Sequence, residues 1–141
     1  MSTTTYSDAT LRRILTGVRT IALVGASANP NRPSHRVMAF LKSKGFRVIP
    51  VNPGLAGQDL MGEAVRARVQ DIAEAVDMVD VFRTPDQVPP VVADAIAKGG
   101  VRVLWMQLGI RNEEAAAAAE AAGMEVVMDR CPTIEMPRLG L

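Results

Sequence analysis

The feature that most limits the fold of this sequence is a regular alternation of short apolar runs with amphipathic segments, which continues from residue 10 almost to the end. Apolar runs of about five residues are typical of strands that are buried on both faces. The amphipathic segments between them have the spacing of helices that cover such strands. Strands are therefore expected at residues 20–24, 47–51, 78–82, 101–107 and 124–128.

Helices are expected before the first strand and between later ones, at about residues 8–18, 33–44 and 88–98 and between Asn112 and Gly123. A helix that connects two neighbouring strands makes those strands parallel. The pattern therefore predicts an α/β protein with a Rossmann-like, doubly wound, mainly parallel sheet of five to six strands and helices on both faces.

The chain of 141 residues has the length of one domain, and we expect residues 1–141 to form a single one. Its core would span about residues 20–131, after an N-terminal helix and before an irregular tail at 132–141. The weakest pattern lies at residues 55–76, where we expect one short strand near Ala64 and a short helix further on.

The composition excludes several classes of protein. The formal net charge of +1 provides no overall field for nucleic acid or for an anionic membrane. No apolar stretch approaches the roughly 20 residues of a membrane span, and the polar residues 1–8 do not form a secretion signal. Cys131 is the sole cysteine, so neither an internal disulfide nor a zinc site of cysteines is expected, which favours the reducing cytoplasm.

The loop after the first strand predicts an anion site. Open parallel sheets bind ligands at the carboxyl ends of their strands, and this loop leads from Gly25 into the start of a helix. The N–H groups and the dipole at such a helix start attract phosphate. Hydroxyl donors and cations flank this start, namely Ser27, Ser34, Arg32, His35 and Arg36. For His35, a role as a helix cap or as a surface residue is at least as strong an interpretation as contact with a ligand.

Three further loops follow strands of the predicted sheet and should reach the same edge. Arg83, Thr84 and Pro85 follow the third strand, and Gln107 and Gly109 follow the fourth. These residues could either contact a ligand or have a purely structural role. Arg83, for example, could form an ion pair with Asp80 or Asp86. Cys131, beside Arg130 after the last strand, is either a reactive thiol or a small core residue.

The end of the second strand counts against binding of NAD, although it does not exclude NADP. An enzyme that binds NAD usually has Asp or Glu at the end of the second strand to bind the ribose hydroxyls, whereas this chain has Asn52 there. Of the motif GxGxxG only Gly25 is present. With one histidine and no cluster of carboxylates in these loops, neither a catalytic triad nor a metal centre is expected.

Four segments together carry a resemblance to a known family. They are IALVGASANPNRPSHRVMAFLKSKGFRVIPVNP, VDMVDVFR, LWMQLGI and VVMDRCP. In this order they resemble the stand-alone CoA-binding proteins, which are related to the CoA-binding domain of the succinyl-CoA synthetase alpha subunit and of NDP-forming acyl-CoA synthetases. The resemblance covers residues 20–135.

The resemblance implies a Rossmann-like domain that binds coenzyme A along the strand ends. It implies that the loop at Gly25, Ala26 and Ser27 takes phosphates, and that Asn52, Pro53 and Gly54 border the nucleotide. It also implies a crevice lined by Arg83, Thr84 and Pro85, with Met106, Gln107 and Gly109 beside the adenine or the pantetheine arm and Cys131 near the thiol.

One departure from the family is Leu55, which stands where many relatives have a basic residue, so that Arg32 or Arg36 would have to supply this phosphate contact. A second is that the ligase machinery of the synthetases does not follow Leu141. The expected function is therefore to bind CoA or an acyl-CoA, as a carrier, sensor or detached subunit without catalysis of its own. The alternatives are a small NAD(P)-binding oxidoreductase and a redox module in which Cys131 forms a disulfide with CoA.

Overall fold

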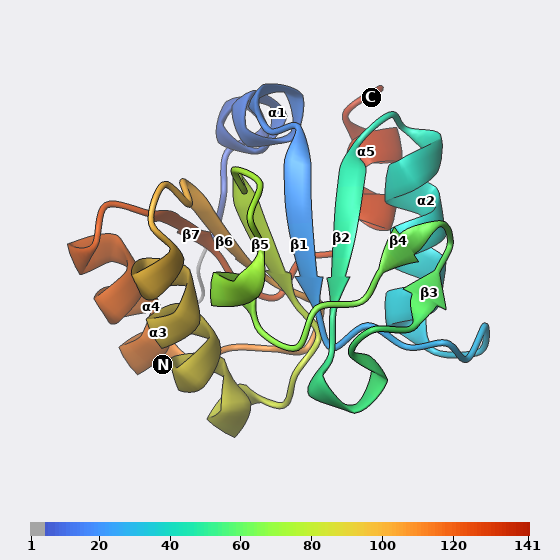
Figure 1. Cartoon of the computed structure of the whole chain (residues 1–141). Helices are drawn as coiled ribbons and strands as arrows, with labels where there is room; N and C mark the ends of the chain where they lie inside the picture. Colours follow the sequence, from blue (N-terminus) through green and yellow to red (C-terminus); the bar gives the residue numbers. More distant parts are fainter. Residues whose placement is uncertain (1–4) are drawn as a thin grey trace.

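A five-stranded parallel sheet forms the centre of the computed structural model, which describes residues 5–141 (Figure 1). The strands lie in the order β2-β1-β5-β6-β7. Their bounds are β1 Thr20–Val24, β2 Arg47–Val51, β5 Met78–Val81, β6 Val103–Met106 and β7 Glu125–Val127. The Rossmann-like, doubly wound α/β fold predicted from the sequence is confirmed, with five strands.

Helices cover both faces of this sheet (Figure 1). On one face lie α1 Asp8–Gly17, α2 Pro33–Ser43 and α5 Pro132–Arg138. On the other lie α3 Val88–Lys98 and α4 Glu113–Ala121. Successive side chains of a strand point to opposite faces, so Ile21 and Leu23 pack under the first group while Ala22 and Val24 pack under the second.

The helix ends follow from the local sequence. The side chain of Asn112 caps α4 by accepting a hydrogen bond from the N–H of Ala115 at 2.9 Å. Ser7 caps α1 in the same way. By contrast, Arg32 precedes α2 without any side-chain cap, and Pro33 occupies the first turn. The start of α2 is therefore open to a ligand.

The segment between β2 and β5 holds more structure than predicted. The short strand expected near Ala64 is β4 Glu63–Ala64, and it pairs with β3 Asp59–Leu60 in a small antiparallel hairpin that the sequence analysis missed. The expected short helix is a single 3-10 turn, η2 Val69–Asp71, and another turn, η1 Pro53–Leu55, follows β2 directly.

The prediction of an irregular tail is wrong, because α5 Pro132–Arg138 occupies most of it. Pro132 stands in the first turn, where it costs no hydrogen bond, and Met136 and Leu139 are buried against the sheet with helical spacing. Arg138 then joins both ends of the chain, because it forms ion pairs with Asp8 and with Glu135.

No helix among residues 5–141 is both long and apolar enough to cross a membrane. Residues 1–4, which the sequence analysis assigned to the single domain, lie outside the described residues.

Candidate functional site

Three adjoining hollows form one groove along the carboxyl ends of the central strands. The first, with a volume of ≈ 620 Å³, lies between the loop after β1 and the loop after β2. The second, of ≈ 340 Å³, lies over the ends of β5 and β6 and shares Arg32 and Arg83 with the first. The third, of ≈ 330 Å³, shares Gln107 and Leu108 with the second and ends at Cys131. Each volume falls within the usual range of ligand sites.

Gly25 sets the course of the loop after β1. Its φ is +92°, and a Cβ added there would lie 2.4 Å from the carbonyl oxygen of Phe82, so no other residue fits without displacing backbone. The N–H groups of Gly25 and Ala26 both donate to the carbonyl oxygen of Val51, at 2.9 and 3.3 Å. These two N–H groups therefore hold the loop against β2 and are not free for a phosphate.

Donors that remain open lie further along the same loop. Ser27, whose hydroxyl accepts a hydrogen bond from the N–H of Asn29 at 3.0 Å, lines the first hollow. Ser34 is buried in the first turn of α2 and lines the second hollow. Pro33 has no N–H, and the N–H groups of His35 and Arg36 donate to the carbonyl oxygen of Arg32, so the start of α2 offers this part of the groove the N–H of Ser34 and the positive end of the helix dipole.

Two guanidinium groups supply positive charge at the junction of the first two hollows. Arg32 is exposed and Arg83 is half-buried, and both line the two hollows. In the described part of the chain neither side chain forms a hydrogen bond or an ion pair with the protein. Arg36 lines the third hollow and donates to the carbonyl oxygen of Asn31 at 2.8 Å. His35 lines none of the hollows found among residues 5–141.

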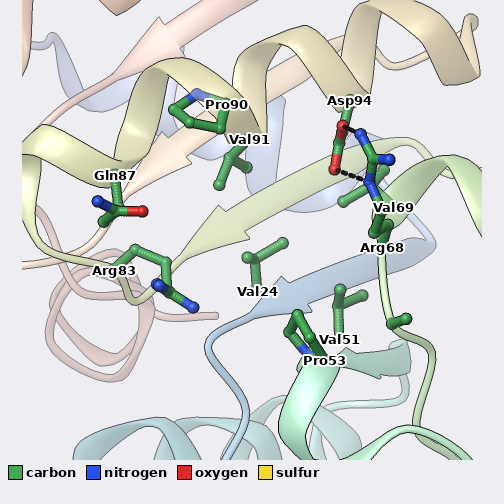
Figure 2. A pocket seen from close by; sticks show the side chains of 11 residues that line it. Val24, Val51, Pro53, Arg68, Val69, Arg83, Gln87, Pro90, Val91 and Asp94 are labelled. Carbon is green, nitrogen blue, oxygen red and sulfur yellow. Dashed lines mark hydrogen bonds and ion pairs between the residues drawn. The ribbon is translucent and has the colours of Figure 1, made fainter.

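A fourth, mostly apolar hollow of ≈ 240 Å³ opens beside the groove, on the α3 face (Figure 2). Valine side chains from β1, β2 and α3 form its walls, and Pro53 lies at the end of β2. Arg68 and Asp94 form a two-bond ion pair on one wall, at 2.5 and 3.2 Å. Arg83 reaches this hollow as well, so its charge lies where the apolar hollow meets the groove.

Other residues predicted to bind the ligand also line the first two hollows. The side chain of Asn52 ties two loops together by accepting from the N–H of Gly54 and donating to the carbonyl oxygen of Ala26, each at 2.8 Å. Asn52 and Gly54 also line the first hollow, and Thr84 and Pro85 line the second.

Two predicted residues support the site from outside it. Met106 is fully buried among the side chains under α3 and α4, away from the groove. Gly109 adopts a φ of +84° and donates its N–H to the carboxylate of Asp129 at 2.7 Å, which joins the loops after β6 and β7. Neither lines a hollow in the described part of the chain.

Gln107 and Cys131 lie on the α2 side of the groove. Gln107 is 6% exposed, and its amide oxygen is buried without a hydrogen-bond partner among the described residues. Cys131 is 7% exposed, with its sulfur 2.8 Å from the hydroxyl of Thr133. The neighbouring Arg130 guanidinium lies over the ring of Tyr6, with 5.2 Å to the ring centroid.

Sequence reasoning missed the environment of Asp80. This carboxyl group lies in the middle of β5, completely buried between Leu23 and Trp105, and neither oxygen has a hydrogen-bond partner in residues 5–141. Burial raises the pKa of Asp80 to about 8. The pairing with Arg83 that the sequence left open is therefore not formed, while Arg83 does help to lower the pKa of Asp86, after the larger effects of hydrogen bonds from Thr84 and Gln87.

The site contains no arrangement for a metal ion, since residues 5–141 hold no group of three His, Cys, Asp or Glu side chains suited to one. The groove instead combines a helix start without a cap, two guanidinium groups, buried amide and hydroxyl groups, and apolar surface. An extended ligand with both anionic and apolar parts matches this combination.

Comparison with known proteins identifies the family. A family model described as a CoA binding domain matches residues 19–137. The chain belongs to this CoA binding domain family. It is 35% identical over 125 residues to the uncharacterized protein YneT of Bacillus subtilis (strain 168), a match that covers 89% of this chain and 90% of YneT.

Solved structures of related proteins agree. Cell-free ID.343 from Thermus thermophilus is 40% identical, with a TM-score of 0.90, and the match covers 95% of this chain and 99% of that one. The apo form of the dinucleotide forming acetyl-coenzyme A synthetase 1 of Ca. Korarchaeum cryptofilum is 27% identical, with a TM-score of 0.68 over 83% of this chain and 27% of that one. The resemblance of this CoA binding domain to such synthetases is thereby confirmed.

Proposed function

We propose that this chain binds coenzyme A or an acyl-CoA in the groove at the strand ends, as a carrier, sensor or detached subunit without catalysis of its own. One observation carries the proposal. Arg32 and Arg83 lie at the junction of two hollows, beside the start of α2 that lacks a side-chain cap, and neither forms a hydrogen bond or an ion pair within residues 5–141. Cations held free beside an open helix start match a diphosphate.

The proposed placement of the ligand follows the chemistry of the hollows. The diphosphate lies between Arg32, Arg83 and the first turn of α2. The nucleotide lies toward Asn52, Pro53 and Gly54, where the apolar hollow of Figure 2 offers space for a base. The pantetheine arm runs past Gln107, and its thiol reaches Cys131 in the third hollow. Gly25 and Ala26 form part of the wall of the first hollow, whereas Met106 is buried in the core under α3 and α4.

The groove lacks the groups that acyl transfer to CoA would need, as far as the described residues define it. Its polar side chains are guanidinium, amide and hydroxyl groups and one thiol, which bind anions and carbonyl oxygens. We therefore propose a binding role, and a cytoplasmic location in line with the single cysteine.

Isothermal titration with coenzyme A, dephospho-CoA, pantetheine and NADP tests the proposal. Coenzyme A should bind most tightly, because it alone offers the diphosphate, the ribose phosphate and the pantetheine arm together. The R83A variant should weaken binding of coenzyme A by about tenfold to a hundredfold, the effect of one lost charge-assisted contact.

The matched control is Arg19→Ala, which removes the same charge from an exposed side chain at the opposite edge of the sheet, just before β1. This variant should bind coenzyme A as the wild type does. Equal losses in both variants would mean that only the overall charge matters. Tighter binding of NADP than of coenzyme A would favour the nicotinamide alternative instead.

A further inference from the structure

The third hollow brings the only thiol of the chain to the end of the groove. Cys131 lines it together with Arg36, Val37, Gln107 and Thr133. Only 7% of the surface of Cys131 is exposed. A reagent therefore reaches this sulfur most directly by lying in the groove, because the core side chains of α2 and α5 cover its other sides.

A second observation points to a ligand in the same place. Gln107 lines both the second and the third hollow, on the face of the sheet where Trp105 and Cys131 lie. Its buried amide oxygen has no hydrogen-bond partner among residues 5–141. A buried acceptor without a donor costs free energy, and a ligand that carries an N–H group would satisfy it. The pantetheine arm contains amide N–H groups close to its thiol.

We propose that Cys131 is a thiol–disulfide exchange site that joins the protein covalently to coenzyme A under oxidising conditions. The inference rests on the proposed function, because the groove must first hold the ligand. The co-reactant is the disulfide of coenzyme A. The thiolate of Cys131 attacks one sulfur of that disulfide, a new S–S bond forms to the protein, and the old S–S bond breaks.

The step is balanced in electrons and protons. The sulfur of Cys131 is oxidised from thiol to disulfide, and the released coenzyme A is reduced to its thiol and takes up the proton that Cys131 loses. Attack by a second thiol on the mixed disulfide reverses the step. The hydroxyl of Thr133, 2.8 Å from the sulfur, is the donor of that pair once the thiol has lost its proton, and so it orients the sulfur of Cys131.

Covalent attachment would change what the site does. A reversible carrier exchanges its ligand, whereas the mixed disulfide retains coenzyme A until a thiol releases it. The buried position of Cys131 makes the exchange selective, because a disulfide without the nucleotide gains nothing from Arg32 and Arg83. Binding in the groove raises the effective concentration of the ligand sulfur beside Cys131, so the disulfide of coenzyme A should react at least about tenfold faster than glutathione disulfide.

The experiment incubates the full chain with the disulfide of coenzyme A, or with glutathione disulfide at the same concentration, and follows the intact mass without reductant. Because the chain has one cysteine, an adduct of one coenzyme A places the bond at Cys131 without further mapping. We expect this adduct to form, to disappear with dithiothreitol, and to form more slowly when acetyl-CoA, which has no free thiol, competes for the groove. The C131S variant should bind coenzyme A reversibly and give no adduct.

The outcomes separate the inference from the proposed function. If titration shows reversible binding of coenzyme A but its disulfide gives no adduct, the exchange site is refuted and the binding function stands. Equal rates with the two disulfides refute a role for the groove in delivering the ligand. If the folded chain binds no coenzyme A by titration, the proposed function itself fails. The Q107A variant provides an internal check, because it should slow adduct formation by the disulfide of coenzyme A more than adduct formation by glutathione disulfide.

Discussion

The buried carboxyl group of Asp80 should make the stability of this protein depend on pH in an unusual direction. Burial raises the pKa of Asp80 from its ordinary 3.8 to about 8 in the fold, with both oxygens left without a partner in the described part of the chain. In the unfolded chain the same group loses its proton near its ordinary pKa. Between these two values the folded state binds one proton more than the unfolded state does.

The sign and size of the effect follow from this difference in bound protons. The folded state is stabilised fully below the unfolded pKa, and this contribution falls as the pH rises towards the folded pKa near 8. The slope is about 1.4 kcal/mol per pH unit, so between pH 5 and pH 8 the free energy of unfolding should fall by about 4 kcal/mol from this group. Most acidic groups with shifted pKa values in this chain act in the opposite direction, because their pKa values are lowered.

The Asp80→Asn variant tests this reasoning, because the amide has nearly the same shape and does not titrate. We expect urea denaturation of the wild type to show the falling stability from pH 5 to pH 8, and the variant to show a curve that is flatter by about 1.4 kcal/mol per pH unit. The control Asp86→Asn removes an exposed carboxylate whose pKa is lowered, so over this range it should run parallel to the wild type. If the free energy of unfolding changed with pH equally in the wild type and in Asp80→Asn, the raised pKa of Asp80 would be refuted.

Three other substitutions test the fold. Gly25→Ala should lower the free energy of unfolding by about 2 to 4 kcal/mol in chemical denaturation, because the new Cβ meets the Phe82 carbonyl at a positive φ; a loss below about 0.5 kcal/mol would contradict the close approach. Asn112→Ala should cost about 1 kcal/mol by the same measurement, since α4 loses its cap, and an unchanged stability would show that the cap is dispensable. Arg138→Ala removes the exposed ion pair with Asp8 and leaves the buried carboxylate of Glu135 without its guanidinium partner, so it should lower the free energy of unfolding by about 1 to 3 kcal/mol; a loss below about 0.5 kcal/mol would contradict a role for this pair in anchoring α5.

The sheet could be predicted because each of its strands is a short run of mostly apolar residues that are consecutive in the sequence. A strand buried on both faces needs apolar side chains at nearly every position, and β6 satisfies this requirement throughout, as does β1 after Thr20. The tail did not reveal α5, because the helix has seven residues and Pro137 stands inside it, which a sequence pattern takes as a break. The hairpin β3–β4 has two residues in each strand, too few to show alternation.

The site was predictable to the level of its loops and no further. The rule that parallel sheets bind ligands at their carboxyl ends selected the segments that contain Arg32, Arg83, Gln107 and Cys131, and all four line the groove. The rule could not tell which donors of a loop the protein uses itself. The loop at Gly25, Ala26 and Ser27 was expected to take phosphates, but the N–H groups of Gly25 and Ala26 donate to the carbonyl oxygen of Val51, a contact that depends on how β2 lies beside β1.

The burial of Asp80 also could not be predicted from the sequence. In the sequence the run around it differs from a fully apolar strand by one carboxyl group, which could equally have reached solvent at a sheet edge. The strand order settles the matter, because β5 lies between β1 and β6 and both faces of the sheet are covered. The raised pKa of Asp80 therefore depends on the strand order of the sheet, whereas the anion site depends on the residues of the loops. The Asp80→Asn substitution should change how stability depends on pH without moving Arg32 or Arg83. We therefore expect it to leave the affinity for coenzyme A unchanged.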